Sequence, residues 1–79
     1  MTDKELNTDP VAVAKGACGE IETVRRKLQT LCEQLAVKND TAKELARNAL
    51  CKALVERLEL AEREALELIE LIVATQTSP

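Results

Sequence analysis

The sequence of 79 residues contains no Phe, Trp or Tyr and no His. Without aromatic rings the chain has no platform on which bases stack and no aromatic cage for a cation. Without His it has no histidine general base and no metal site with histidine ligands. These absences argue against an enzyme, and we expect no cofactor, no metal ion and no small-molecule substrate.

The chain has only two Gly and two Pro, and it lacks a long apolar run. No stretch reaches the roughly 20 apolar residues that a membrane-spanning helix needs. The first ten residues are polar and do not form a signal peptide. The three cysteines, Cys18, Cys32 and Cys51, form no CxxC pair and leave an odd thiol. A reducing, cytoplasmic location is therefore expected, with the cysteines as small apolar residues on half-buried helix positions. A reactive or metal-binding role is the alternative.

The hydrophobic residues of this chain are aliphatic: 12 Leu, 6 Val, 3 Ile and 11 Ala make up most of a hydrophobic fraction of 46%. That fraction is ordinary for a globular chain. A chain this short forms one small domain, and below roughly 80 residues a single core rarely makes a monomer very stable. We therefore expect oligomerisation. The net charge of −3 argues against broad binding to a phosphate backbone.

The first predicted helix spans about residues 10–37, after a flexible polar tail at 1–8. Asp9 and Pro10 indicate its start, because Asp is a good N-cap and the first helical position does not need the N–H that Pro lacks. Apolar residues then recur at alternating spacings of three and four, as in a coiled coil. They are Ala14, Ala17, Ile21, Val24, Leu28, Leu31 and Leu35.

A second helix is predicted over about residues 41–74, after a turn at 38–40 and before a flexible tail at 76–79. Thr41 and Glu44 fit a capping box, in which each side chain accepts a hydrogen bond from an N–H at the helix start. The helix carries its own heptad-spaced stripe, formed by Cys51, Leu54, Leu58, Ala61, Ala65, Leu68 and Ile72.

Two helices joined by so short a turn fold back on each other, so residues 9–75 are predicted to form an all-α, two-helix antiparallel hairpin. If the helices pair directly across the turn, residue i lies opposite residue 78 − i, and Val24 meets Leu54. The second helix is apolar over more than half its girth, which exceeds what one neighbouring helix covers. We therefore predict that two hairpins dimerise into a four-helix bundle.

Candidate residues for a dimer or partner interface lie in the second half of the chain. The apolar side chains there crowd toward the helix end, where they form either the core of a dimer or a patch that binds another protein. The candidates are Leu54, Leu58, Leu60, Leu66, Leu68, Ile69, Leu71, Ile72 and Val73.

Two further features of the sequence have alternative explanations. Gly16 and Gly19 lie inside the first helix, where each costs about 1 kcal/mol relative to Ala. They are a tolerated weak spot or break, or a hinge or a place where a partner approaches closely. Arg25, Arg26 and Lys27 form the only basic cluster, either a solvated face or, when doubled in a dimer, a weak candidate for contact with nucleic acid.

The sequence favours a non-enzymatic protein-interaction module, a homodimer that acts on an unidentified protein partner as chaperone, adaptor or inhibitor. Its acidic surface, with six glutamates after residue 55, fits either plain solubility or docking of a basic protein. The alternatives are a nucleic-acid-binding regulator that uses the basic cluster and a structural subunit of a larger assembly.

Overall fold

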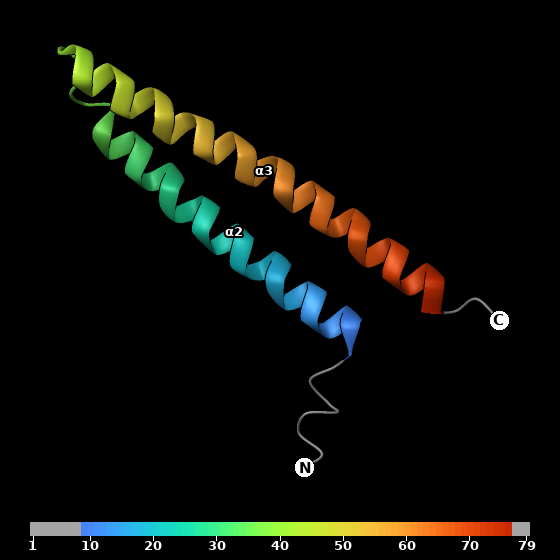
Figure 1. Ribbon diagram of the computed structural model, residues 1–79. Coiled ribbons are helices and arrows are strands. Elements are labelled where there is room, and N and C mark those ends of the chain that lie inside the picture. The colour runs from blue at the N-terminus through green and yellow to red at the C-terminus, as the bar shows by residue number, and fades with distance from the viewer. Residues whose placement is uncertain (1–8, 77–79) are drawn as a thin grey trace.

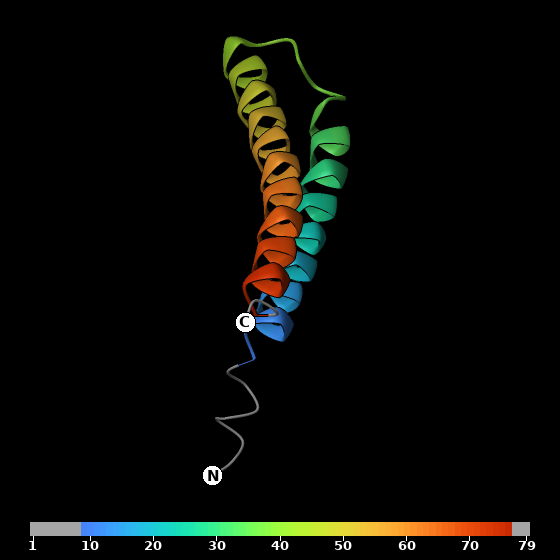
Figure 2. The same cartoon turned by 90° about the vertical axis from the view of Figure 1, so that its right-hand side faces the viewer.

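The computed structural model describes residues 9–76, and over these residues it contains two helices. Helix α2 spans Pro10–Leu35 and helix α3 spans Ala42–Gln76. The helices run side by side in opposite directions (Figure 1) and cross at a shallow angle (Figure 2). The predicted all-α hairpin is thereby confirmed. The predicted tail at 1–8 lies outside the described residues, as do residues 77–79 of the tail predicted at 76–79, whereas Gln76 is the last residue of α3.

Both helix starts follow from local hydrogen bonds that the sequence indicates. Asp9 caps α2, because its Oδ1 accepts from the Val11 N–H at 3.1 Å. At the start of α3, Thr41 Oγ1 accepts from the Glu44 N–H at 3.1 Å, and Glu44 Oε1 accepts from the N–H groups of Thr41 and Asp40. The backbone hydrogen bonds from Thr41 and Asp40 lower the pKa of Glu44 below its ordinary value.

The connection between the helices is longer than the sequence indicates. It comprises residues 36–41, so α2 ends two residues before the predicted position 37, and α3 extends two residues past position 74. Arg47 caps this end of α2: its Nη2 donates to the backbone oxygens of Leu35, the last residue of the helix, and of Lys38 in the connection, both at 2.9 Å. Helix C-termini leave such oxygens without partners, and a cation satisfies them well.

The seam between the helices is formed by residues that recur at alternating spacings of three and four. On α2 these half-buried residues are Val11, Ala14, Cys18, Ile21, Arg25, Leu28, Cys32 and Leu35. On α3 they are Cys51, Val55, Leu58, Glu62, Ala65, Ile69 and Ile72. Among the described residues, only Cys51 and Val55 are buried. The hairpin therefore has a narrow core that covers one side of each helix.

The seam is rotated from the stripe predicted for α2. Ala14, Ile21, Leu28 and Leu35 belong to both, but Val24 and Leu31 are exposed while Arg25 and Cys32 face α3. Judged by apolarity alone, the row that contains Val24 and Leu31 is favoured over the neighbouring row that contains Arg25 and Cys32. The fold selects the other because Arg25 finds an opposite charge on α3, and because a small Cys lets the helices approach each other.

The same rotation affects α3. Leu54 and Leu68 of the predicted stripe are exposed, and the seam contains Val55, Glu62 and Ile69 instead. Because both helices are rotated relative to the predicted stripes, each has a row of apolar residues that lies outside the seam.

The pairing of residues across the seam also differs from the predicted rule. Pairing of i with 78 − i would place Arg25 opposite Ala53, but Arg25 forms an ion pair with Glu62. The Cys32 thiol forms a hydrogen bond with Cys51 rather than lying opposite residue 46. The longer connection accounts for the shift, because it lets α3 begin further along the chain before it turns back over α2.

Helix α2 passes through Gly16 and Gly19 without a break. Neither glycine has a positive φ, and a Cβ built on either meets no atom within 4 Å. Within this hairpin the glycines are therefore not a place of close approach to α3. Toward the stability of the hairpin they contribute the entropic weakness of glycine inside a helix.

Replacement of Gly16 and Gly19 by Ala tests this assignment. Each substitution should raise the free energy of unfolding by about 1 kcal/mol, because Ala lowers the entropy of the unfolded chain and meets no steric conflict. Urea titration followed by circular dichroism at 222 nm measures the effect. A lower stability of either variant would show that the space beside the glycine is occupied, as expected for a docking point.

Candidate functional site

A charged pair lies in the middle of the seam. Arg25 Nε donates to Glu62 Oε2 across the two helices, and only 18% and 19% of the two side chains are exposed. The hydrogen bond to Glu62 raises the pKa of Arg25 above its ordinary value. Arg25 Nη1 also donates to Gln29 Oε1 at 2.6 Å, and Gln29 Nε2 lies 3.4 Å from Glu59 Oε2. This network fixes which residues of the two helices lie at the same level.

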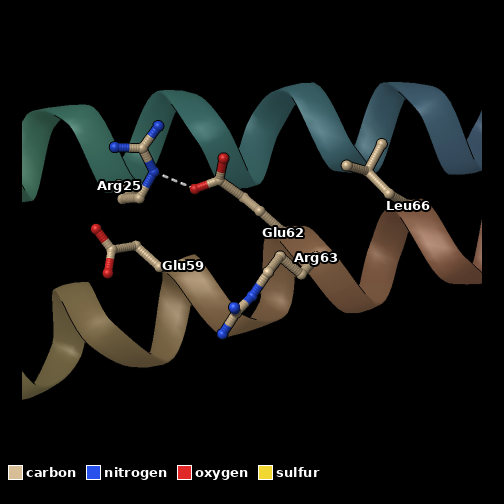
Figure 3. Close-up of a pocket in the computed structure, with 5 residues that line it drawn as sticks. All are labelled: Arg25, Glu59, Glu62, Arg63 and Leu66. Atoms are coloured by element: carbon tan, nitrogen blue, oxygen red, sulfur yellow. Dashed lines mark hydrogen bonds and ion pairs between the residues drawn. The ribbon is translucent and has the colours of Figure 1, made fainter.

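A shallow groove surrounds the charged pair. It is lined by Arg25, Glu59, Glu62, Arg63 and Leu66. Figure 3 shows Arg25 and Glu62 reaching toward each other from facing helices, with Glu59 and Leu66 beside them and Arg63 turned away from α2. The lining offers two carboxylates, two guanidinium groups and one apolar side chain.

The predicted basic cluster is largely paired with acidic residues. Arg25 is held by Glu62 within the seam, and Arg26 Nη2 donates to Glu22 Oε2 at 2.6 Å on the surface of α2. Lys27 is exposed. The three side chains leave α2 in different directions, and one of them is committed to the seam, so they do not form one basic patch.

Two cysteines face each other near the connection. Cys32 and Cys51 are free thiols, and Cys51 Sγ donates to the Leu28 backbone oxygen at 3.8 Å. The hydrogen bond with Cys51 and the burial of the site raise the pKa of Cys32 to about 11. A thiol with so high a pKa carries little thiolate at neutral pH, and the thiolate is the reactive form. The arrangement agrees with the expected packing role.

The main candidate site is an apolar surface that runs along one side of the hairpin. Val24 and Leu31 of α2 each precede a seam residue by one position, as do Leu54 and Leu68 of α3. In an antiparallel pair, the positions that precede the seam on both helices lie on the same side. We call this surface the apolar face; it comprises Val13, Ala17, Val24, Leu31, Leu50, Leu54, Ala61, Leu68 and Leu71.

The opposite side of the hairpin has a different character. Gln29 and Glu59, which each follow a seam residue, meet there, and Glu22 and Lys52 lie along the same side. Two large apolar residues, Leu66 and Val73, lie beyond them and are 54% and 43% exposed. The two sides therefore differ, since one is apolar over most of its length and the other is polar with an apolar end.

The candidate interface residues from the sequence are divided between three surfaces. Leu58, Ile69 and Ile72 are half-buried in the seam against α2. Leu54, Leu68 and Leu71 belong to the apolar face. Leu66 and Val73 lie on the opposite side, and Leu60 lies on the outer surface of α3.

Sequence reasoning missed the contribution of α2 to the apolar face, because it assigned Val24 and Leu31 to the hairpin core. It also missed the role of Glu62. Both could have been found from a second heptad pattern in the sequence, in which each of Ala17, Val24 and Leu31 is replaced by the residue that follows it. This reading places Arg25 and Glu62 in the seam together, where opposite charges suit each other.

Neither α2 nor α3 is long and apolar enough to cross a membrane. Within residues 9–76, no three Cys, Asp or Glu side chains gather in a way that could hold a metal ion. By its fold, the chain is a two-helix all-α hairpin. Comparison with protein-family models, curated proteins and solved structures gives no match.

The ion pair predicts coupled effects of substitution at its two positions. Glu62→Gln or Arg25→Gln alone should lower the melting temperature by several degrees, since each leaves a half-buried charge without its partner. The exchange Arg25→Glu/Glu62→Arg should recover most of the loss. Circular dichroism melts at one protein concentration measure all three variants. Additive losses in the exchanged variant would show that the two residues do not interact.

The shifted pKa of Cys32 predicts slow alkylation. At neutral pH the rise from 9.0 to about 11 lowers the thiolate fraction of Cys32 about a hundredfold. Labelling with iodoacetamide, read by peptide mass spectrometry, should be slow at Cys32 and accelerate as the pH rises toward 11. In Cys51→Ala, which lacks the hydrogen-bond partner, Cys32 should react faster at neutral pH. Equal rates in both proteins would contradict the assigned cause.

Proposed function

We propose that this chain is a non-enzymatic protein-interaction module, a helical-hairpin homodimer that binds another protein and modulates it as a chaperone, adaptor or inhibitor. The observation that carries the proposal is the apolar surface that the seam leaves uncovered. Leu50 and Leu71, for example, are each 63% exposed. Exposed apolar surface of this extent marks interaction sites in small proteins.

The two sides of the hairpin suit two different tasks. The apolar face extends over both helices and is suited to a large, permanent contact such as self-association. Leu66 and Val73, which we call the client edge, form a smaller site on the opposite side and remain accessible when the apolar face is covered.

The charges around the client edge indicate what kind of protein it binds. Glu59, Glu62 and Glu70 lie on the same side of α3 as Leu66 and Val73. Arg63 also lines the groove beside Leu66, and Glu62 is paired with Arg25, so Glu59 and Glu70 leave a modest acidic excess. Small apolar anchors in such a surrounding complement an amphipathic helix that carries basic residues. The proposed client therefore presents such a helix.

The nucleic-acid alternative has less support. Arg25 is occupied by Glu62, and an acidic α3 lies beside the cluster, so that a phosphate backbone would meet repulsion as well as attraction. The alternative remains testable by titration with RNA and DNA at low salt, where electrostatic binding is strongest. Saturable binding that Arg26→Gln/Lys27→Gln abolishes would favour it over a protein client.

Capture of proteins from a lysate, read by quantitative mass spectrometry, tests the client edge. The wild type should enrich a basic, helix-containing protein, and Leu66→Glu should lose it at least about tenfold, because a charge in an apolar contact is not solvated. Leu60→Glu is the matched control, since Leu60 has similar exposure (48%) but lies on the outer surface of α3. It should retain the client.

The same variants reveal a wrong assignment. If Leu66→Glu dissociates the homodimer and leaves capture unchanged, the client edge belongs to self-association. If Leu66→Glu and Leu60→Glu lose the client equally, the binding site is not confined to this side of the hairpin.

A further inference from the structure

We infer that the apolar face binds the same face of a second copy in antiparallel orientation, with the two connections at opposite ends and a two-fold axis beside Val24 and Ala61. The inference rests on the proposed self-association and specifies its surface, orientation and register. Its evidence is the order of side chains along the face, which is self-complementary on both helices.

On α3 the order is symmetric about Ala61. Leu54 and Leu68 lie seven residues before and after Ala61. When two α3 helices run antiparallel with Ala61 against Ala61, Leu54 of each copy meets Leu68 of the other. A two-fold interface requires such reciprocal pairs, and a small residue at the centre lets the helices approach closely.

The adjacent row of α3 repeats the symmetry with charges. It contains Leu50, Arg57, Glu64 and Leu71 at spacings of seven. In the same antiparallel arrangement, Leu50 meets Leu71 of the second copy, and Arg57 meets Glu64. Two equivalent ion pairs thus lie at the rim of the contact, where opposite charges set orientation more than affinity.

Helix α2 shows the same symmetry about Val24. Ala17 and Leu31 lie seven residues before and after it, and Glu20 and Lys27 lie in the adjacent row. With Val24 against Val24, Ala17 meets Leu31 of the second copy and Glu20 meets Lys27. A pattern that arises twice, on two helices, is stronger evidence than either pattern alone.

Both symmetries share one axis because of the register of the hairpin. Arg25 and Glu62 form an ion pair across the seam, and Val24 and Ala61 are the residues directly before them. Because the helices run antiparallel, stepping back one residue on each moves in opposite directions, so Val24 and Ala61 lie at levels that differ by about 3 Å. A single two-fold axis, perpendicular to the helices and in the plane of the apolar face, passes beside both.

The other two-fold arrangement brings like charges together. If the two hairpins pointed the same way, α2 would lie against α3 of the second copy, and residues at the same level would meet. Glu20 would then lie near Glu64 of the second copy, and Lys27 near Arg57. Each contact occurs twice in a two-fold dimer, which gives four contacts between like charges. Such contacts are unfavourable, so the charges select the antiparallel dimer.

Charge exchange separates the two arrangements. In the antiparallel dimer, Arg57→Glu replaces two attractions by two repulsions and should raise the dimer Kd about tenfold. Arg57→Glu/Glu64→Arg should restore the Kd to near the wild-type value. Arg63→Glu is the matched control, with the same change of charge outside the apolar face, and should leave the Kd unchanged. Sedimentation equilibrium with interference detection measures each Kd.

In the same-direction dimer Arg57→Glu would relieve repulsion with Lys27, so a lower Kd for that variant would overturn the inference. An Arg57→Glu/Glu64→Arg variant that stays as weak as Arg57→Glu would also overturn it, because the reciprocal pair would then not exist.

Cross-linking locates the axis. Ala61→Cys should form a disulfide-linked dimer with oxidised glutathione, since the axis brings two copies of position 61 together. Glu59→Cys on the opposite side, and the wild type with its cysteines in the seam, should not. A mixture of Val24→Cys and Ala61→Cys proteins should give only the two homodimers; a mixed cross-link would indicate the same-direction dimer.

Failure of this inference is distinguishable from failure of the proposed function. A dimer that neither cross-links at position 61 nor responds to charge exchange leaves client capture intact and overturns only the geometry. A chain that stays monomeric at millimolar concentration overturns the dimer itself, while the loss of client with Leu66→Glu still reports on the client edge.

Discussion

The ion pair between Arg25 and Glu62 is the contact on which the arrangement of this hairpin depends. Aliphatic side chains pack in several registers with similar energies, because apolar contacts are not directional. A charged pair within the seam favours the register in which both groups have their partner, since separating them leaves two half-buried charges to be solvated. The pair therefore sets the level of every residue of α2 relative to α3, including residues that never touch it.

The charged pair also determines which side chains remain outside. A seam that contains Arg25, Glu62 and small cysteines needs fewer of the aliphatic residues that the chain carries. Val24, Leu31, Leu54 and Leu68 are left on one side as a result. Helices in a four-helix bundle bury about three positions in seven, whereas a two-stranded seam buries two. The row that contains Val24, Leu31, Leu54 and Leu68 occupies the third of these positions, which a single hairpin leaves uncovered.

Much of the fold follows from local signals in the sequence. The N-cap at Asp9, the capping box at Thr41 and the heptad spacing predict both helices and their antiparallel order. These signals work because each involves residues within one or two turns. The end of α2 is capped by Arg47, which reaches back from the other helix, and no local pattern indicates that contact.

The candidate site was harder to predict for a related reason. Spacing identifies two overlapping heptad readings of α2, and apolarity alone favours the one with Val24 and Leu31. The pattern that contains Arg25 and Cys32 is favoured only once Arg25 is known to have a partner, Glu62, on the other helix. The exposed residues of α3 were in part anticipated, because its apolar girth exceeds what one neighbour covers. The residues that α2 contributes to the apolar face could not be told apart from core residues, because the sequence does not show how α2 is rotated about its own axis.

The hydrogen bonds of Arg47 have a consequence for the way the chain folds. They join Arg47 to Leu35 and Lys38 across a short stretch of chain, so the loop that they close costs little entropy. Pairing of the helices can then extend outward from the connection one layer at a time, each new contact separated by only slightly more chain. Such a topology favours rapid folding of the single hairpin. Assembly, which depends on concentration, is then the slower event.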